Sequence, residues 1–154
     1  MPKVIEMIDI SLTDDWSKEE SLLVKNILIG ALDNVENQDN EEISVLLTND
    51  YEIRKLNKKY RNVNKTTNVL SFPMNNKINN LGNKMLGDIV ISKDTLLKES
   101  KEKKKDLDAC IAHMIVHGLL HLKGYEHQEK ADAEIMENRE IMILKRLGFP
   151  NPYI

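Results

Sequence analysis

The 154-residue chain has a mass of 17.8 kDa and is 41% apolar, which is enough for one domain with its own hydrophobic core. Its 22 basic and 25 acidic residues give a net charge of −3, which excludes a uniformly basic nucleic-acid-binding protein. The average hides an uneven distribution, because residues 51–105 hold 14 basic and 5 acidic residues (+9), whereas residues 1–50 hold 3 and 12 (−9).

The N-terminal region predicts a strand followed by a helix. Residues 3–10 alternate apolar and polar side chains, which is typical of a half-buried strand. Ser17 and Glu20 have the spacing of a capping box, in which each side chain accepts a hydrogen bond from the other residue's backbone. Apolar residues then recur at helical intervals, so we expect a helix over about residues 17–34.

A second strand and a second helix follow. Residues 42–48 form a short, β-branched and apolar run, which favours a strand. Asn49 and Glu52 are positioned to cap the next helix. That helix carries its larger apolar side chains on one face, at Ile53, Leu56 and Tyr60.

Two further strands are expected on either side of a loop. Residues 68–73 end in a proline, which predicts that the strand stops there, and residues 86–92 supply its partner. Between them, residues 74–85 are rich in Asn and include Gly82. This segment has the composition of a mobile loop.

Three helices complete the chain. Ser92 can cap a helix to about residue 101, and a last helix is expected over about residues 129–147. Residues 106–122 are apolar on every side of the helix axis, which indicates a buried helix. The order of elements predicts an α+β fold in a single domain over residues 1–154. We expect a small mixed four-stranded sheet packed against several helices, including a buried central helix.

All four histidines lie between residues 113 and 127. His117 and His121 are one helical turn apart, the spacing at which two imidazoles reach one metal ion. Gly124 can end the helix in a left-handed turn and bring His127 back as a third nitrogen ligand. Three such ligands leave one tetrahedral position for water. Zinc suits imidazole ligands, although nickel, iron and copper also accept them.

The histidines could also be structural residues that bind no metal. A histidine in a buried helix is more often a hydrogen-bonded core residue than a ligand, and pairs at this spacing also arise without metal. The surroundings favour metal, because so apolar a helix offers few partners for several buried imidazoles. His113 lies one turn before His117 and could be a ligand instead of His127. A fourth histidine would close the site, so we expect His113 to be buried or to support a ligand.

The motif differs from that of the zinc proteases. In His-Glu-x-x-His, the glutamate beside the first ligand activates the metal-bound water, and here that position is Gly118. The usual protease base is missing, which argues against a peptide hydrolase.

The segment from His117 to His127, His-Gly-Leu-Leu-His-Leu-Lys-Gly-Tyr-Glu-His, resembles the signature His-Gly-x-Leu-His-Leu-x-Gly-Tyr-Asp-His of the YbeY-type endoribonucleases, also described as ribosomal RNA maturation factors. Two more segments match in order, Thr-Asn-Val-Leu-Ser-Phe-Pro at 67–73 after Tyr-Arg at 60–61, and Leu-Gly-Asp-Ile at 86–89. The resemblance spans about residues 46–127. One departure is Glu126, where the family usually has Asp, and the longer side chain puts a fixed role for that carboxylate in doubt.

The resemblance also implies functional residues. His117, His121 and His127 match the family's zinc ligands, so one Zn²⁺ ion is the expected cofactor. Arg61 matches its functionally implicated arginine, and a guanidinium suits phosphate because it offers bidentate donors and keeps its charge near a metal. Without the resemblance, an arginine near a helix end would be taken for solvated surface. The general base is left unassigned, and the candidates for orienting water or ligands are Ser71, Asp88 and Glu126.

The implied function is that of a metal-dependent, single-strand-specific endoribonuclease. It would act in rRNA processing, including 16S rRNA 3′-end maturation, and in ribosome quality control. The main alternative is a non-catalytic ribosome assembly factor in which zinc only stabilises the fold. The expected partners are single-stranded or ribosomal RNA, with ribosomal proteins or assembly factors as further candidates.

The basic segment supports an RNA partner, because Arg61 is surrounded in the sequence by Arg54, Lys55, Lys58, Lys59 and Lys65. The lysines between residues 93 and 105 serve equally well to keep helices soluble. The aromatic content of 5% argues against an extended base-stacking surface. The chain starts without a basic leader and apolar stretch, and no run approaches the roughly 18 apolar residues of a membrane span, so we expect a soluble, cytoplasmic protein with no membrane partner.

Overall fold

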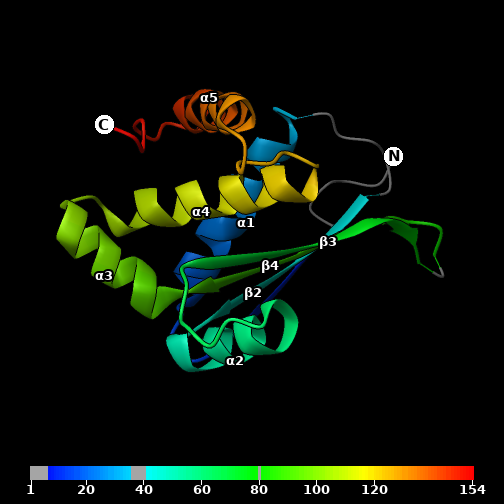
Figure 1. The fold of residues 1–154 in the computed structure, drawn as a ribbon, viewed down its shortest axis with the longest axis horizontal. Coiled ribbons are helices and arrows are strands. Elements are labelled where there is room, and N and C mark those ends of the chain that lie inside the picture. The colour runs from blue at the N-terminus through cyan, green and yellow to red at the C-terminus, as the bar shows by residue number, and fades with distance from the viewer. Residues whose placement is uncertain (1–6, 36–40, 80) are drawn as a thin grey trace.

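The computed structural model describes residues 7–35, 41–79 and 81–154, which form five helices and one mixed sheet (Figure 1). The sheet has four strands in the order β1-β2-β4-β3. Strands β1, β2 and β4 run parallel, and β3 pairs antiparallel with β4 at one edge of the sheet. The strands are β1 (Ile8–Leu12), β2 (Glu41–Thr48), β3 (Val69–Ile78) and β4 (Lys84–Ser92). This architecture confirms the expected α+β fold.

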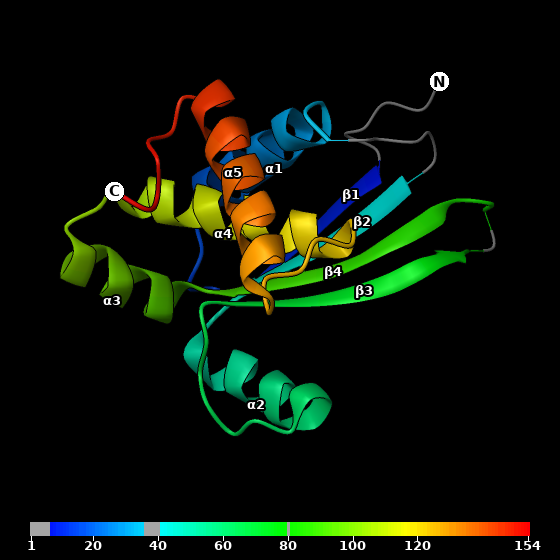
Figure 2. The same cartoon turned by 45° about the horizontal axis from the view of Figure 1, so that its top comes forward.

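Helices cover both faces of the sheet, as Figures 1 and 2 show. Helices α1 (Lys18–Leu32) and α4 (Leu107–Leu122) lie on one face, and α5 (Lys130–Arg146) packs on α4. Helix α2 (Asp50–Arg61) lies on the opposite face, and α3 (Lys93–Lys103) extends from the end of β4. No described helix is both long and apolar enough to cross a membrane.

Helix α4 is the buried central helix that its composition predicts. Ile115 and Leu119 are fully buried, in one core with residues of α1, α5 and the sheet. A smaller cluster lies under α2 and is formed by Ile53, Leu70 and Val90. Because side chains alternate along a strand, neighbouring residues of β3 and β4 enter the two clusters in turn. The two faces of the sheet thus have separate apolar environments.

The predicted helix starts are largely confirmed. Ser17 Oγ accepts from the backbone N–H of Glu20 at 3.1 Å, and Glu20 Oε1 accepts from that of Ser17 at 2.9 Å. Asn49 Oδ1 likewise accepts a hydrogen bond in the first turn of α2. Ser92 precedes α3 but does not cap it, because its hydroxyl donates to Asp50 Oδ1 at 2.6 Å. The predicted first strand is observed as β1, and residues 3–6 lie outside the described part of the chain.

The prediction of a loop over residues 74–85 is wrong for most of that segment. Strand β3 continues past Pro73 as far as Ile78, and β4 begins at Lys84. Proline stops a strand where its missing N–H would be needed in the ladder, but β3 is an edge strand and its register shifts between Pro73 and Lys77. The irregularity accommodates the proline, and pairing resumes beyond it.

The short turn that remains is held by asparagine side chains. Asn79 N–H donates to the carbonyl of Asn83 at 2.9 Å. The side-chain amides of Asn79 and Asn83 donate to the two carboxylate oxygens of Glu42 on β2, at 2.7 and 2.9 Å. The asparagines that suggested a mobile loop therefore tie the hairpin to the neighbouring strand.

Candidate metal centre

His117 and His121 face each other on α4. Their Nε2 atoms are 3.1 Å apart and their ring centroids 4.6 Å apart. The helix presents them on one side because a spacing of four residues is close to one turn. Both side chains are partly buried, and the pairing expected from the sequence is present in the geometry.

His127 returns to this pair from the loop after α4. Gly124 has a φ of +98°, a left-handed conformation that side-chain-bearing residues rarely adopt, and its N–H donates to the carbonyl of His121 at 3.0 Å. The chain reverses there and places the His127 ring 5.2 Å from that of His117 and 4.6 Å from that of His121. One ligating nitrogen from each histidine lies within 4.8 Å of the other two.

Hydrogen bonds fix the tautomers of the first two histidines. His117 Nδ1 lies 2.6 Å from a carboxylate oxygen of Glu140, and His121 Nδ1 lies 2.9 Å from the carbonyl oxygen of Tyr125. These oxygens only accept, so both Nδ1 atoms carry the proton and both Nε2 atoms present lone pairs. Two lone pairs 3.1 Å apart repel each other, so either a proton shared by the two nitrogens or a metal cation has to lie between them. With His127 beside the pair, the arrangement is one that can hold a metal cation.

The donor set fits a zinc ion. With zinc–nitrogen bonds of ~2.05 Å at tetrahedral angles, two ligating nitrogens stand about 3.3 Å apart, which is close to the observed pair. The pKa of His121 is lowered by burial and by the neighbouring His117 and His127, which favours the neutral, metal-binding form. Nickel, iron and copper accept the same three imidazoles, so the donor set alone does not identify the ion.

Glu140 contacts two of the histidines and was not predicted from the sequence. It lies on α5, is fully buried, and accepts from His117 Nδ1 at 2.6 Å and from His113 Nε2 at 2.9 Å. The Tyr153 hydroxyl donates to the same carboxylate. Burial alone would raise the pKa of Glu140, but the hydrogen bonds from His113, His117 and Tyr153 outweigh it and lower the pKa to about 2. The carboxylate is therefore ionised at neutral pH.

One signal in the sequence could have revealed Glu140. It lies four residues after Met136 and three before Ile143, and both of these side chains are buried against the core. An acidic residue on the apolar stripe of a helix needs a buried partner. The four histidines of α4 and the loop after it are the candidates for such a partner.

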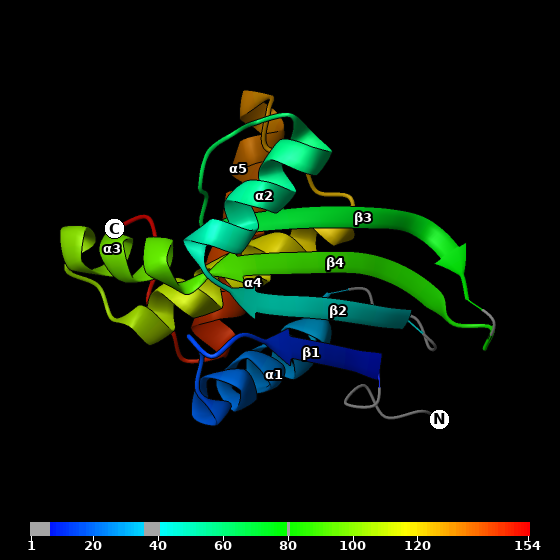
Figure 3. The ribbon, with the colours of Figure 1, turned by 90° about the horizontal axis from the view of Figure 1, so that it is seen from below.

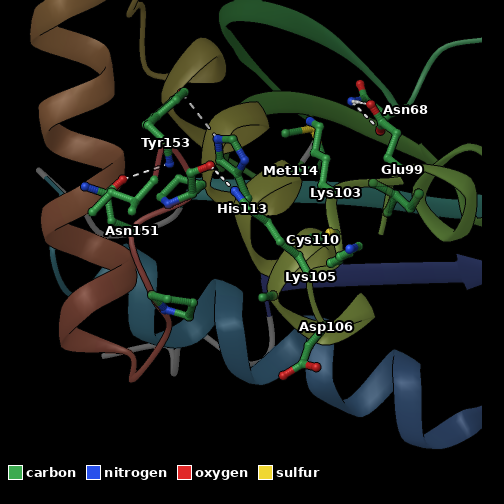
Figure 4. A pocket seen from close by; sticks show the side chains of 16 residues that line it. Asn68, Glu99, Lys103, Lys105, Asp106, Cys110, His113, Met114, Asn151 and Tyr153 are labelled. Atoms are coloured by element: carbon green, nitrogen blue, oxygen red, sulfur yellow. Dashed lines mark hydrogen bonds between the residues drawn. The ribbon is translucent and has the colours of Figure 1, made fainter. Parts of the chain in front are cut away.

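His113 lies beside the cluster and bonds to Glu140. It also contacts Tyr153, with 3.3 Å between His113 Nε2 and the phenolic oxygen. Figure 4 shows these two side chains at a pocket of about 500 Å³ between α3, α4 and residues 150–154. Burial and the contact with Glu140 raise the pKa of Tyr153, so its hydroxyl stays protonated and donates. In the described geometry, His113 supports the cluster through Glu140.

Arg61 lies on the other side of the sheet, at the end of α2 (Figure 3). Its Nη2 donates to the carbonyl oxygen of Ser71 at 2.5 Å, and its Cζ lies 5.1 Å from the centre of the Phe72 ring. Ser71 belongs to edge strand β3, which α4 contacts from the opposite face. Arg61 and helix α4 thus contact the edge strand from its two sides.

Asp88 and Glu126, two of the candidates for orienting water or ligands, lie in different surroundings. Asp88 lines a groove on the α2 face of the sheet with Leu56, Tyr60 and Phe72, whereas α4 packs on the other face. Burial raises the pKa of the Asp88 carboxyl. Glu126 is exposed in the loop that carries His127.

Gly118 packs directly against the sheet. A Cβ atom at this position would lie 3.1 Å from Ile89 Cγ2, so residue 118 points into the core. A glutamate here would be buried among apolar side chains. The geometry gives a second reason why this helix does not carry the protease base.

Part of the basic segment has structural contacts. Lys93 Nζ lies 2.8 Å from Glu20 Oε1 and donates to the carbonyl of Asp15, and Lys105 donates to the carbonyl of Pro152. By contrast, the basic side chains around Arg61 are exposed; they are Arg54, Lys55, Lys58, Lys59 and Lys65. Lys98, Lys101, Lys103 and Lys104 of α3 and its end are exposed as well, so exposed positive charge lies both on α2 with its following loop and on α3.

Known proteins resemble this chain over nearly its whole length. A family model described as Endoribonuclease YbeY matches residues 8–148. A Francisella tularensis protein (strain SCHU S4) named Endoribonuclease YbeY is 36% identical over 160 residues, covering 100% of this chain and 95% of its own. A protein of the same name from Rhizobium meliloti is 40% identical over 149 residues, covering 90% and 89%. The solution structure of TM1509 from Thermotoga maritima shares the fold, with a TM-score of 0.58, 23% identity and 92% of each chain covered.

Proposed function

Because the chain belongs to the YbeY endoribonuclease family, we propose that it cleaves single-stranded RNA as a zinc-dependent hydrolase. The observation that carries the proposal is the pair of Nε2 atoms of His117 and His121, 3.1 Å apart and grouped with a ring nitrogen of His127. This arrangement suits one zinc ion bound by His117, His121 and His127. When bound, zinc supplies a Lewis acid that acidifies water and polarises a phosphoryl oxygen.

Arg61 is the proposed phosphate-binding residue. The bond to Ser71 uses one of the five N–H groups of its guanidinium, and the side chain is exposed, so further donors face solvent. Lys58, Lys59 and Lys65 extend the positive charge along the same surface. We propose that the RNA backbone crosses the edge of β3 between this surface and the histidine cluster, held by charge rather than by base stacking.

The biological role that we propose is rRNA processing, including 16S rRNA 3′-end maturation, and ribosome quality control. Family membership supports this role. Ribosomal RNA is then the substrate, and ribosomal proteins or assembly factors are the proposed partners.

Cleavage of defined nucleic acids tests the proposal. The zinc-loaded protein is incubated with an end-labelled single-stranded RNA, the DNA of the same sequence and the RNA duplex. We expect cleavage of the single-stranded RNA alone, its loss on chelation and its return with added zinc. His121→Ala, purified identically, controls for contaminating nuclease, and equal activity of that preparation would refute the proposal.

Two further outcomes identify the attacking group and test the non-catalytic alternative. Products that end in a 2′,3′-cyclic phosphate would assign the attack to the substrate's 2′-hydroxyl and exclude direct attack by water. If no RNA is cut, zinc removal melts the protein and Arg61→Ala leaves ribosome maturation intact, the protein is the non-catalytic assembly factor instead.

A further inference from the structure

Glu140 is a fully buried carboxylate whose two oxygens are both engaged. Oε2 lies 2.6 Å from His117 Nδ1, and Oε1 lies 2.9 Å from His113 Nε2 and also accepts from the Tyr153 hydroxyl. An ionised carboxylate in a protein core is costly unless it is fully hydrogen-bonded. The contacts come from α4 and the C-terminal segment, so this charge is held by parts of the chain that are distant in sequence.

The contact with His117 sets which ring nitrogen is available to a metal. Since the carboxylate accepts a hydrogen bond from Nδ1–H, the proton stays on Nδ1, Nε2 is left to face a metal and the ring plane is fixed. A carboxylate in this position also makes the imidazole a stronger electron donor. His121 obtains the same orientation from a neutral backbone carbonyl, 2.9 Å from its Nδ1.

We propose that Glu140 is the positioning residue of the metal centre, which holds the His117 ring so that Nε2 faces the ion. This inference rests on the proposed metal site and adds a residue from α5 to it. His113 and Tyr153 hold the second oxygen of Glu140, so that Oε2 stays directed at His117.

Glu140 does not itself fit the role of a metal ligand. Ligand atoms of His113, His117 and Glu140 do lie within 4.8 Å of one another. Their contacts of 2.6 and 2.9 Å are, however, ordinary hydrogen bonds between nitrogen donors and carboxylate oxygens. A metal among these three groups would have to displace the Nδ1 proton of His117, whereas a metal bound with His121 and His127 leaves that proton in place.

Zinc affinity tests the proposal without reference to RNA cleavage. The full chain is stripped of metal, and its affinity for Zn²⁺ is measured by competition with a chromophoric chelator at neutral pH. We expect Glu140→Gln, which keeps the size of the side chain, to weaken zinc binding about 10- to 100-fold. Glu134→Gln makes the same change at an exposed site of α5 and is expected to leave the affinity within about twofold.

A spectroscopic measurement tests whether Glu140 holds the His117 ring in the zinc-loaded protein. In the ¹H–¹⁵N spectrum of the zinc-loaded protein, the Nδ1 proton of His117 should resonate far downfield because it bonds to a carboxylate. In Glu140→Gln this signal should move upfield, while that of His121 stays in place. A purely structural role of Glu140 would lower stability and leave zinc affinity unchanged, so the signal is read together with the affinity.

The outcomes distinguish the inference from the function on which it rests. If His117→Ala loses zinc while Glu140→Gln binds it within about twofold of the wild type, the positioning role is wrong and the metal site stands. If His117→Ala binds zinc normally, the metal site itself is wrong. Should Glu140→Gln fail to fold, Tyr153→Phe decides. Loss of its hydroxyl should weaken zinc binding a few-fold, and unchanged affinity and an unchanged His117 signal would overturn the proposal.

Discussion

Replacing Arg61 by alanine should abolish most of the RNA cleavage while leaving the protein folded. The structural contacts of this side chain are few. It donates one hydrogen bond to the Ser71 carbonyl, lies over the Phe72 ring and is exposed at the end of α2. A hydrogen bond of this kind contributes ~1 kcal/mol and an exposed cation–π contact ~0.5–1 kcal/mol. The free energy of unfolding should therefore fall by roughly 2 kcal/mol at most.

The expected loss of activity is larger than this loss of stability. Removing one group that stabilises charge on a reacting phosphoryl or acyl centre typically costs about 100- to 1000-fold in rate, which is ~2.7–4 kcal/mol. Arg61→Lys keeps the charge but not the forked donors, so its activity should lie between those of alanine and the wild type.

Urea unfolding and kcat/KM on single-stranded RNA, measured in parallel, test this prediction. The matched control is Arg146→Ala, since Arg146 is also exposed at a helix end and donates one side-chain hydrogen bond, to Asn34 Oδ1 at 2.6 Å. It should lose comparable stability and little activity. Equal losses of kcat/KM in the two variants, or a loss of stability in Arg61→Ala large enough to account for its activity, would refute the reasoning.

Three further predictions concern the scaffold. In Gly118→Ala the added Cβ lies 3.1 Å from Ile89, but the helix gains propensity, so the free energy of unfolding should fall by about 0–2 kcal/mol in thermal unfolding. In Gly118→Glu it should fall by more than ~3 kcal/mol, and this variant should show no peptidase activity. Burial raises the folded-state pKa of Asp88, so stability should decline as pH rises through that pKa. Asp88→Asn should then be the more stable protein at neutral pH, and a lower Tm would contradict this. Ser17→Ala should lower the free energy of unfolding by ~1 kcal/mol because the helix cap is lost, whereas Ser17→Gly should lower it by only about a few tenths of a kcal/mol. Equal losses in the two variants would show that the cap is not the cause.

Local spacing predicted the histidine cluster because its geometry is set within one helix and one turn. His117 and His121 follow from the pitch of α4, and the left-handed Gly124 explains how His127 returns. Glu140 could not be placed in the same way. It lies 23 residues after His117, and its position depends on how α5 packs against α4, which periodicity alone does not specify.

Strand alternation accounts for the position of Asp88. This residue adjoins Ile89, which faces α4, so a strand of period two directs Asp88 to the opposite face. The alternation is visible in the sequence, but it does not say which face of β4 meets the histidine helix. The hairpin beyond Pro73 could not be predicted for another reason. The segment is rich in asparagine, which is typical of loops, and Glu42, to which Asn79 and Asn83 bond, is remote in sequence.

The origin of Glu140 in the last helix has a consequence for the order of events during folding. The contact with His117 spans 23 residues, and Tyr153 contacts the same carboxylate from 13 residues further along the chain. While the chain is being synthesised, α4 and the Gly124 turn can form before α5 is complete, but the His117 ring is not yet held. A metal ion that arrives early would meet a loose set of imidazoles. Docking of α5 would then complete the centre, so that firm metal retention would require α5 to have been made and packed against α4.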